Sequence, residues 1–182
     1  PKMLVAGSCV RPADFDQDGD LDLFIGGQID LDNYPGAPPS FLLENRNGRF
    51  VKMKSGLGDW SSFIGMVNDA VWEDLDNDTY PDLVMVGDWM PITIAWNHSN
   101  DFKLEFVEHS GGLWNCVELT DWNADGFIDI IAGNQGLNTR LTASLEEPLK
   151  LNKQDLDRNG RPDPVLVQYF SNEKRKRAPY VA

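Results

Sequence analysis

The sequence predicts an all-β fold built from repeated four-stranded antiparallel units, and three observations support this prediction. The pattern Asp-x-Asp/Asn-x-Asp/Asn-x-x-x-Asp occurs four times with the same internal spacing. A short apolar run rich in β-branched residues follows each copy, as expected for a buried strand. Helical periodicity is weak throughout. Repeated pairs of strands, each pair joined by an acidic loop, are therefore the simplest interpretation.

The four acidic loops start at Asp14, Asp74, Asp121 and Asp155. An extended candidate strand precedes each loop, and a buried strand is predicted after each. The predicted buried strands cover residues 23–26, 83–87, 130–133 and 165–167. Each acidic loop is therefore predicted to connect two neighbouring strands.

Two predicted hairpins complete the first two units. Residues 41–45 and 49–53 flank Asn47-Gly48, a strong short-range hairpin signal. Residues 92–97 and 102–107 flank a polar turn in the same relative place. A unit thus consists of a strand, an acidic loop, a second strand and a hairpin.

The spacing of the units indicates a partial β-propeller of three to four blades. Loop starts are 60, 47 and 34 residues apart, a range that includes the usual period of propeller blades. An insertion at residues 28–40 accounts for the longest interval, and residues 136–140 replace the hairpin in the third unit. We expect one propeller segment with approximate units at 1–62, 63–110, 111–146 and 147–182, the last incomplete. The opening residues suggest a piece of a longer chain.

Composition narrows the possible partners. The chain has 182 residues, 41% of them hydrophobic, and a mean hydropathy of -0.39. It lacks the roughly 18 consecutive apolar residues of a membrane-spanning segment, so this segment is not expected to insert into a membrane. Acidic residues outnumber basic ones 29 to 16, for a formal charge of -13. This charge disfavours nucleic acid and suits multivalent cations.

The acidic loops have the chemistry of a calcium site. Carboxylates or amides at positions 1, 3 and 5, a main-chain carbonyl at 7 and a carboxylate at 9 can surround one hard cation, and so many oxygens suit calcium better than magnesium. Position 6 needs a positive φ, and Gly19, Gly126 and Gly160 supply it. Thr79 holds this position in the second loop, so distortion is expected there. Four copies disfavour the alternative of solvated acidic turns. An EF-hand is excluded because position 12 is apolar in every copy.

Residues 13–26 resemble the FG-GAP or VCBS repeat of integrin α-subunit propellers and of many bacterial surface proteins. Residues 42–50, 69–74, 87–91, 133–138 and 147–148 further resemble the repeat region of bacterial ASPIC/UnbV-type proteins. The resemblance implies a β-propeller with a calcium loop between the first two strands of each blade. It also implies export to the cell surface, periplasm or medium, and it implies no single activity.

The resemblance assigns ligands position by position for three to four Ca²⁺ ions. Side-chain ligands at positions 1, 3, 5 and 9 are Asp14, Asp16, Asp18 and Asp22; Asp74, Asp76, Asp78 and Asp82; Asp121, Asn123, Asp125 and Asp129; and Asp155, Asp157, Asn159 and Asp163. Main-chain carbonyl ligands at position 7 are Asp20, Tyr80, Phe127 and Arg161. No catalytic residue is predicted.

Residues other than the predicted metal ligands carry further predictions. Cys9 and Cys116 occupy equivalent places in different units, where they are not expected to lie close enough to form a disulfide. We therefore expect free, buried thiols. His98 and His109 are assigned no chemistry. The six tryptophans suit blade cores better than a sugar-binding platform; they are Trp60, Trp72, Trp89, Trp96, Trp114 and Trp122. A polar connection in the third unit is the main candidate for a function other than metal binding; it contains Asn134, Asn138 and Arg140.

Three functional hypotheses follow. The first is a calcium-binding extracellular repeat module that acts as an adhesion scaffold and binds a protein or glycan. The second is the propeller domain of a calcium-dependent polysaccharide-degrading enzyme, either a lyase or a hydrolase, because a calcium ion with a free coordination position can polarise a sugar acid. The third is a segment that only builds blades.

Overall fold

The computed structural model describes residues 6–53, 64–136, 138–141, 143–170 and 176–181, with side chains up to Tyr169. All regular elements in these ranges are β-strands, which confirms the all-β prediction. The described part contains no helix long and apolar enough to span a membrane. Trp60, Leu137 and the proposed boundary between the first two units lie outside the described residues.

The first sheet is one complete four-stranded unit. Its strands are β1 (Ala6–Ala13), β2 (Asp22–Ile29), β3 (Phe41–Arg46) and β4 (Arg49–Lys52). They pair antiparallel in the order β1-β2-β3-β4, so the predicted unit is confirmed. The β3–β4 hairpin turns at Asn47 and Gly48, with φ values of 57° and 83°. Positive φ at both central residues is the geometry for which Asn-Gly is preferred.

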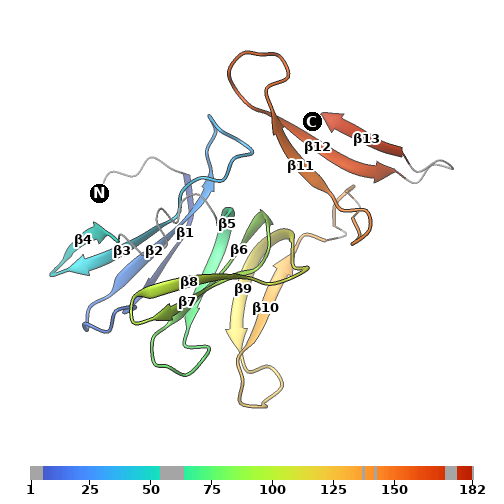
Figure 1. Cartoon of the computed structure of the whole chain (residues 1–182). Helices are drawn as coiled ribbons and strands as arrows, with labels where there is room; N and C mark the ends of the chain where they lie inside the picture. Colours follow the sequence, from blue (N-terminus) through green and yellow to red (C-terminus); the bar gives the residue numbers. More distant parts are fainter. Residues whose placement is uncertain (1–5, 54–63, 137, 142, 171–175, 182) are drawn as a thin grey trace.

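The second sheet repeats the unit and extends it (Figure 1). Its strands are β5 (Met66–Glu73), β6 (Asp82–Met90), β7 (Thr93–His98), β8 (Asp101–Phe106), β9 (Gly112–Thr120) and β10 (Asp129–Asn134). β5 to β8 repeat the arrangement of the first sheet, and the β9–β10 pair joins through short pairing of β6 with β9. Described residues between β10 and β11 form no strand, in agreement with the predicted loss of the third hairpin.

The third sheet contains β11 (Lys150–Gln154), β12 (Asp163–Phe170) and β13 (Lys176–Val181). It lies apart from the other two sheets, and its acidic loop is at the upper end of Figure 1, whereas the first three loops are at the lower end. A hydrogen bond from Lys153 Nζ to Asn33 Oδ1 connects it to the first unit. The whole is a partial β-propeller in which the fourth unit does not continue the stacking of the first three.

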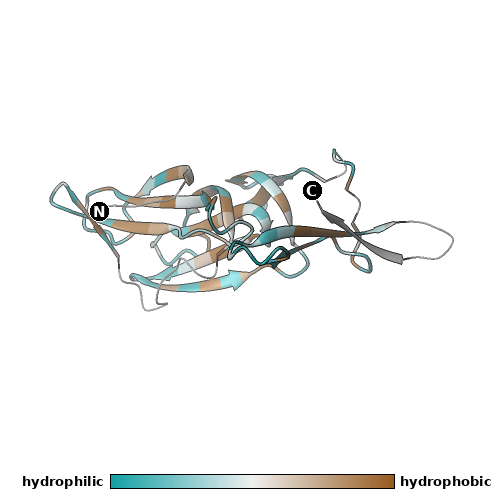
Figure 2. Ribbon diagram, turned by 90° about the horizontal axis from the view of Figure 1, so that it is seen from above, coloured by the Kyte–Doolittle hydropathy of each residue, from teal (hydrophilic) through white to brown (hydrophobic). Residues whose placement is uncertain are grey.

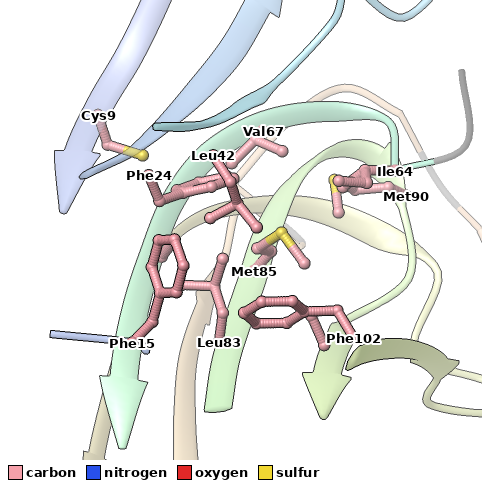
Figure 3. Close-up of a cluster of buried hydrophobic side chains, with 12 residues drawn as sticks. Cys9, Phe15, Phe24, Leu42, Ile64, Val67, Leu83, Met85, Met90 and Phe102 are labelled. Atoms are coloured by element: carbon pink, nitrogen blue, oxygen red, sulfur yellow. The ribbon is translucent and has the colours of Figure 1, made fainter. Parts of the chain in front are cut away.

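The core lies between neighbouring units. Side chains alternate along β6, so Leu83 and Met85 belong to a cluster shared with the first unit, and Val84 and Val86 to one shared with the third. Figure 3 shows the first cluster. Hydrophobic residues gather on the strands of the first two sheets, and the connections are largely hydrophilic (Figure 2). β6 is therefore the central strand of the described structure.

One aromatic side chain of the first acidic loop anchors the first unit to the second. Phe15, at position 2 of the loop, is fully buried. Its ring centroid lies 5.9 Å from that of Trp72 and 5.7 Å from that of Phe102. Trp122, at position 2 of the third loop, is 78% exposed, so its predicted core position is wrong. β10 is the edge strand of its sheet, and no described unit covers the indole there.

A polar contact joins the inner strands of three units. Asp69 on β5 forms an ion pair with Arg11 on β1 and accepts a hydrogen bond from the main-chain N–H of Val117 on β9 at 3.1 Å. Arg11 Nε also donates to the carbonyl of Ala70 at 2.7 Å. Because the Asp69 carboxylate is mostly shielded from solvent, these bonds help to fix the order of the inner strands.

The cysteines differ from each other in exposure. Both thiols are free, as predicted. Cys9 is buried between the first two units, in agreement with prediction, whereas Cys116 is exposed. The prediction was wrong for Cys116 because no described unit packs against it in the way that the second unit packs against Cys9.

Candidate metal centres

The four acidic loops have the same backbone conformation. Position 4 has positive φ in each: 61° at Gln17, 62° at Asn77, 61° at Ala124 and 61° at Arg158. Position 6 also has positive φ: 94° at Gly19, 80° at Thr79, 89° at Gly126 and 84° at Gly160. The second loop therefore keeps the geometry of the others, and the expected distortion is absent. The backbone strain is instead held at Thr79, a β-branched residue.

Four hydrogen bonds recur in every loop and orient the carboxylates. The position 1 side chain accepts from the N–H of position 6 at 3.1, 2.9, 2.8 and 3.0 Å in loops one to four. Position 3 accepts from position 5 at 3.2, 3.1, 2.9 and 3.1 Å. Position 5 accepts from position 7 at 3.0, 2.9, 2.9 and 2.7 Å. Position 9 accepts from position 2 at 3.2, 3.0, 3.0 and 2.8 Å.

These bonds bring predicted ligands together. In three loops a set of three carboxylates offers oxygens within 4.8 Å of one another: Asp14, Asp16 and Asp18; Asp74, Asp76 and Asp82; and Asp155, Asp157 and Asp163. The third loop has the amide of Asn123 at position 3, and its hydrogen bonds match those of the other loops. The carbonyl ligands at position 7 remain a prediction.

The electrostatics of the first loop fit a cation. Asp14 Oδ1 and Asp20 Oδ1 are buried and have no hydrogen-bond partner among the described residues. Burial, with smaller contributions from Asp16 and Asp18, raises the pKa of Asp22 to about 6. A buried carboxylate next to other carboxylates is unfavourable without a counter-ion, and a hard divalent cation would satisfy the oxygens and offset the repulsion.

Asp82 in the second loop is in the same situation. Its side chain is fully buried, and burial raises its pKa. Both oxygens accept main-chain hydrogen bonds, one from Leu75 at 3.0 Å and one from Asn97 at 2.8 Å. The position 9 carboxylate thus connects the acidic loop to the hairpin that follows it.

Two asparagines brace the loops, and sequence reasoning missed both. The main-chain N–H of Asn45 donates to Asp22, as that of Asn97 does to Asp82, each at 2.8 Å. Both side-chain amides donate to the carbonyl at position 8 of their loops, at 3.2 Å. Asn97 also donates to the carbonyl of Phe15 in the first unit at 2.8 Å. The available signal was an asparagine just before the turn in both predicted hairpins.

His98 is a third residue whose position sequence reasoning missed. Its Nδ1 lies 3.0 Å from Asp78 Oδ2 and 3.8 Å from Asp76 Oδ2. The hydrogen bond raises the pKa of His98 and lowers that of Asp78. Pairing of β6 with β7 brings this residue back beside the second loop, so no local spacing pattern could reveal it. The structure thus places His98 beside two predicted ligands of the second loop.

The first and second loops contact each other. Gln17 Nε2 donates to the main-chain carbonyl of Thr79 at 2.7 Å and lies 3.1 Å from its hydroxyl oxygen. Both residues are at the positive-φ positions of their loops. The conformation of one loop is therefore coupled to that of its neighbour.

Of the three described residues predicted in the polar connection of the third unit, only Asn134 lines a pocket. Asn134 lines a pocket, and its Oδ1 accepts a hydrogen bond from the main-chain N–H of Gly136 at 2.8 Å. Asn138 closes a turn through its main-chain N–H, which donates to Gln135. Neither Asn138 nor Arg140 is among the described residues that line the pocket.

Comparison with known protein families supports the repeat architecture. The FG-GAP-like repeat matches residues 14–85 and 74–132, which together span more than half of the chain and include the first three acidic loops. The fourth loop lies outside these matches but has the same four hydrogen bonds. A search of curated proteins gives no match. FG-GAP repeats are typical of extracellular or cell-surface proteins. The chain belongs to the FG-GAP-like repeat family.

Proposed function

We propose that this protein is a calcium-binding extracellular repeat module whose blades act as a scaffold for a protein or carbohydrate partner. The observation that carries the proposal is the identical set of hydrogen bonds in four loops, which turns three carboxylates toward one another in three of them. Such a donor set of hard oxygens suits Ca²⁺. Three to four ions are expected.

The ions would have a structural role. Side chains at positions 1, 3, 5 and 9 would hold each ion, together with the carbonyl at position 7. Bound Ca²⁺ supplies positive charge that offsets the mutual repulsion of the carboxylates. The hydrogen bonds of Asp22 and Asp82 to the following hairpins would pass this rigidity to the blades. The acidic residues are thus accounted for without a catalytic role, which favours binding over polysaccharide degradation.

Calorimetric titration of the EDTA-treated protein with Ca²⁺, using Mg²⁺ as the control ion, tests the proposal. Binding of three to four Ca²⁺ ions and a rise in melting temperature are expected, because an ion that binds only the folded state stabilises it. Asp16→Asn should remove or weaken one site. Asp101→Asn changes an exposed aspartate outside the loops and is the matched control. Absence of both calcium binding and a melting shift would refute the metal assignment.

A further inference from the structure

A pocket of about 590 Å³ lies at the strand ends far from the first three acidic loops. It is formed where β6 and β10 end and β9 begins, together with the connection after β10. Its lining includes Trp89, His109, Leu113, Asn134 and Leu145. The volume is within the usual range of small-ligand sites, roughly 300–1,000 Å³.

Trp89 has an unusual backbone conformation at this pocket. Its φ is 59°, in the left-handed region that bulky residues rarely adopt. It lies at an irregularity in the pairing of β6 with β9, between the pairs Asp88↔Leu113 and Met90↔Gly112. Such irregularities commonly redirect a side chain at a functional site. Strained backbone conformations cluster at ligand-binding sites, so the strain at Trp89 supports a binding role for this pocket.

The charge of the pocket restricts the ligand. One quarter of the chain is charged, yet none of the described lining residues is Asp, Glu, Lys or Arg. An anionic ligand would meet no counter-charge in the pocket and would be repelled by a chain of formal charge -13. A cationic ligand would likewise find no carboxylate in the lining. The pocket therefore suits a neutral ligand.

The polar groups of the pocket indicate a ligand with hydroxyl groups. Asn134 Oδ1 is occupied by the N–H of Gly136, which fixes the orientation of the amide. Its Nδ2 has no hydrogen-bond acceptor among the described residues and lies close above Gly112, where a Cβ would come within 2.4 Å of it. His109 is exposed and adds a second polar group. Beside these groups, the indole and the leucines provide an apolar wall.

We propose that this pocket binds a neutral saccharide, with Trp89 against the apolar face of a sugar ring and Asn134 Nδ2 donating to a hydroxyl. Sugars combine an apolar C–H face with hydroxyl groups, which matches an amphipathic wall of this composition. The inference rests on the proposed binding function and deepens it by naming the site and the ligand class. It does not require that the acidic loops bind calcium.

Affinity electrophoresis tests the inference with named probes. The full chain is run through native gels containing laminarin, galactomannan or xylan, with alginate as the acidic probe and an unmodified gel as reference. We expect retardation by at least one neutral polymer and none by alginate. Retardation by alginate alone, or by none of the neutral polymers, would overturn the proposal, as would binding confined to peptides in a parallel peptide screen.

Three variants locate the binding site. A Cβ on Gly111 would meet nothing within 4 Å, so Gly111→Leu adds bulk at the pocket lining with no clash at the Cβ. Trp89→Gly removes the ring and accommodates the positive φ. Both should weaken binding about tenfold or more, as expected for loss of an interaction centre. Leu31→Ala alters an exposed apolar residue outside the pocket lining, and this variant should bind like the parent.

Melting curves and calcium titrations of the same variants distinguish the possible causes of lost saccharide binding. Trp89→Gly relieves the backbone strain but loses the packing of a half-buried ring, so its melting curve is recorded to establish that the variant is folded. Unchanged saccharide binding in both pocket variants would overturn the proposed site. Calcium titration of the same samples tests the acidic loops independently: intact calcium binding with no saccharide binding refutes this inference alone, and the reverse result refutes only the metal assignment.

Discussion

Replacement of Thr79 by glycine tests whether the acidic loops share one strained geometry. Thr79 has φ of 80°, whereas glycine holds the same position in the other three loops. The substitution Thr79→Gly therefore keeps the backbone and removes an unfavourable β-branched side chain. We expect the second loop to become more stable and its site to bind calcium more tightly, because less strain opposes the closed conformation.

The expected magnitude follows from three contributions. A non-glycine residue held in a sparsely populated backbone region costs about 1–3 kcal/mol. The greater flexibility of glycine in the unfolded chain offsets about 0.5–1 kcal/mol of this gain. Loss of the Thr79 hydroxyl removes one exposed contact with Gln17 at 3.1 Å, whereas the 2.7 Å hydrogen bond to the main-chain carbonyl remains. A net gain of about 0.5–2 kcal/mol is expected.

Thermal unfolding of the EDTA-treated protein measures this gain directly. A change of about 1 kcal/mol shifts the melting temperature of a chain of this size by roughly 2–4 °C. The reverse substitution, Gly126→Thr in the third loop, is the matched variant and should lower stability. Calcium titration of both variants should show opposite changes in affinity. A Thr79→Gly variant that melts lower and binds calcium more weakly would refute the strain argument.

Three further predictions concern burial and pH. The folded pKa of Asp22, about 6, exceeds the ordinary value of 3.8, so in calcium-free protein its stabilising effect is present at low pH and is lost as pH rises through 6. The melting temperature of the EDTA-treated protein should therefore rise when the pH is lowered from 7 to 5. The melting temperature of the calcium-loaded protein should fall over the same range, because acid protonates the ligands. Shifts in the same direction in both samples would contradict this account. Asn97→Ala should cost about 1–3 kcal/mol in urea unfolding, since it removes a buried amide that joins two units; a loss below 0.5 kcal/mol would refute the bracing role. Phe15→Ala should lower the free energy of unfolding by about 3–5 kcal/mol, whereas Trp122→Ala should change it by less than about 0.5 kcal/mol, because only the Phe15 ring is buried. Equal losses of stability in thermal melts would contradict this assignment.

Local patterns in the sequence were sufficient to predict much of the fold. The acidic loops, the strands that follow them and the Asn47-Gly48 hairpin depend on residues close together in the chain, so spacing and turn chemistry identify them. The complete units of the first and second sheets are arranged as predicted. The loss of the third hairpin was also foreseen, because only 34 residues separate the starts of the third and fourth acidic loops.

Long-range contacts account for what the sequence did not reveal. Asn97 and His98 reach the second loop through the pairing of β6 with β7, which brings together residues about 15–20 positions apart. The exposure of Trp122 and Cys116 depends on whether a neighbouring unit covers the third unit. The pocket is lined by Trp89, whose backbone irregularity apolar periodicity does not encode. Each of these features is a property of the assembled sheets.

The burial of Phe15 makes the two sides of a junction between blades different from each other. The first unit supplies the Phe15 ring, and the second unit supplies the rings of Trp72 and Phe102 against which it packs. At the same loop position the second unit has a smaller residue, Leu75, which packs in the cluster shared with the third unit. Each junction is therefore a heterologous contact with its own shape. A recombined gene that exchanged the first two units would place phenylalanine where leucine fits, so the order of the repeats is selected by packing as well as by covalent linkage.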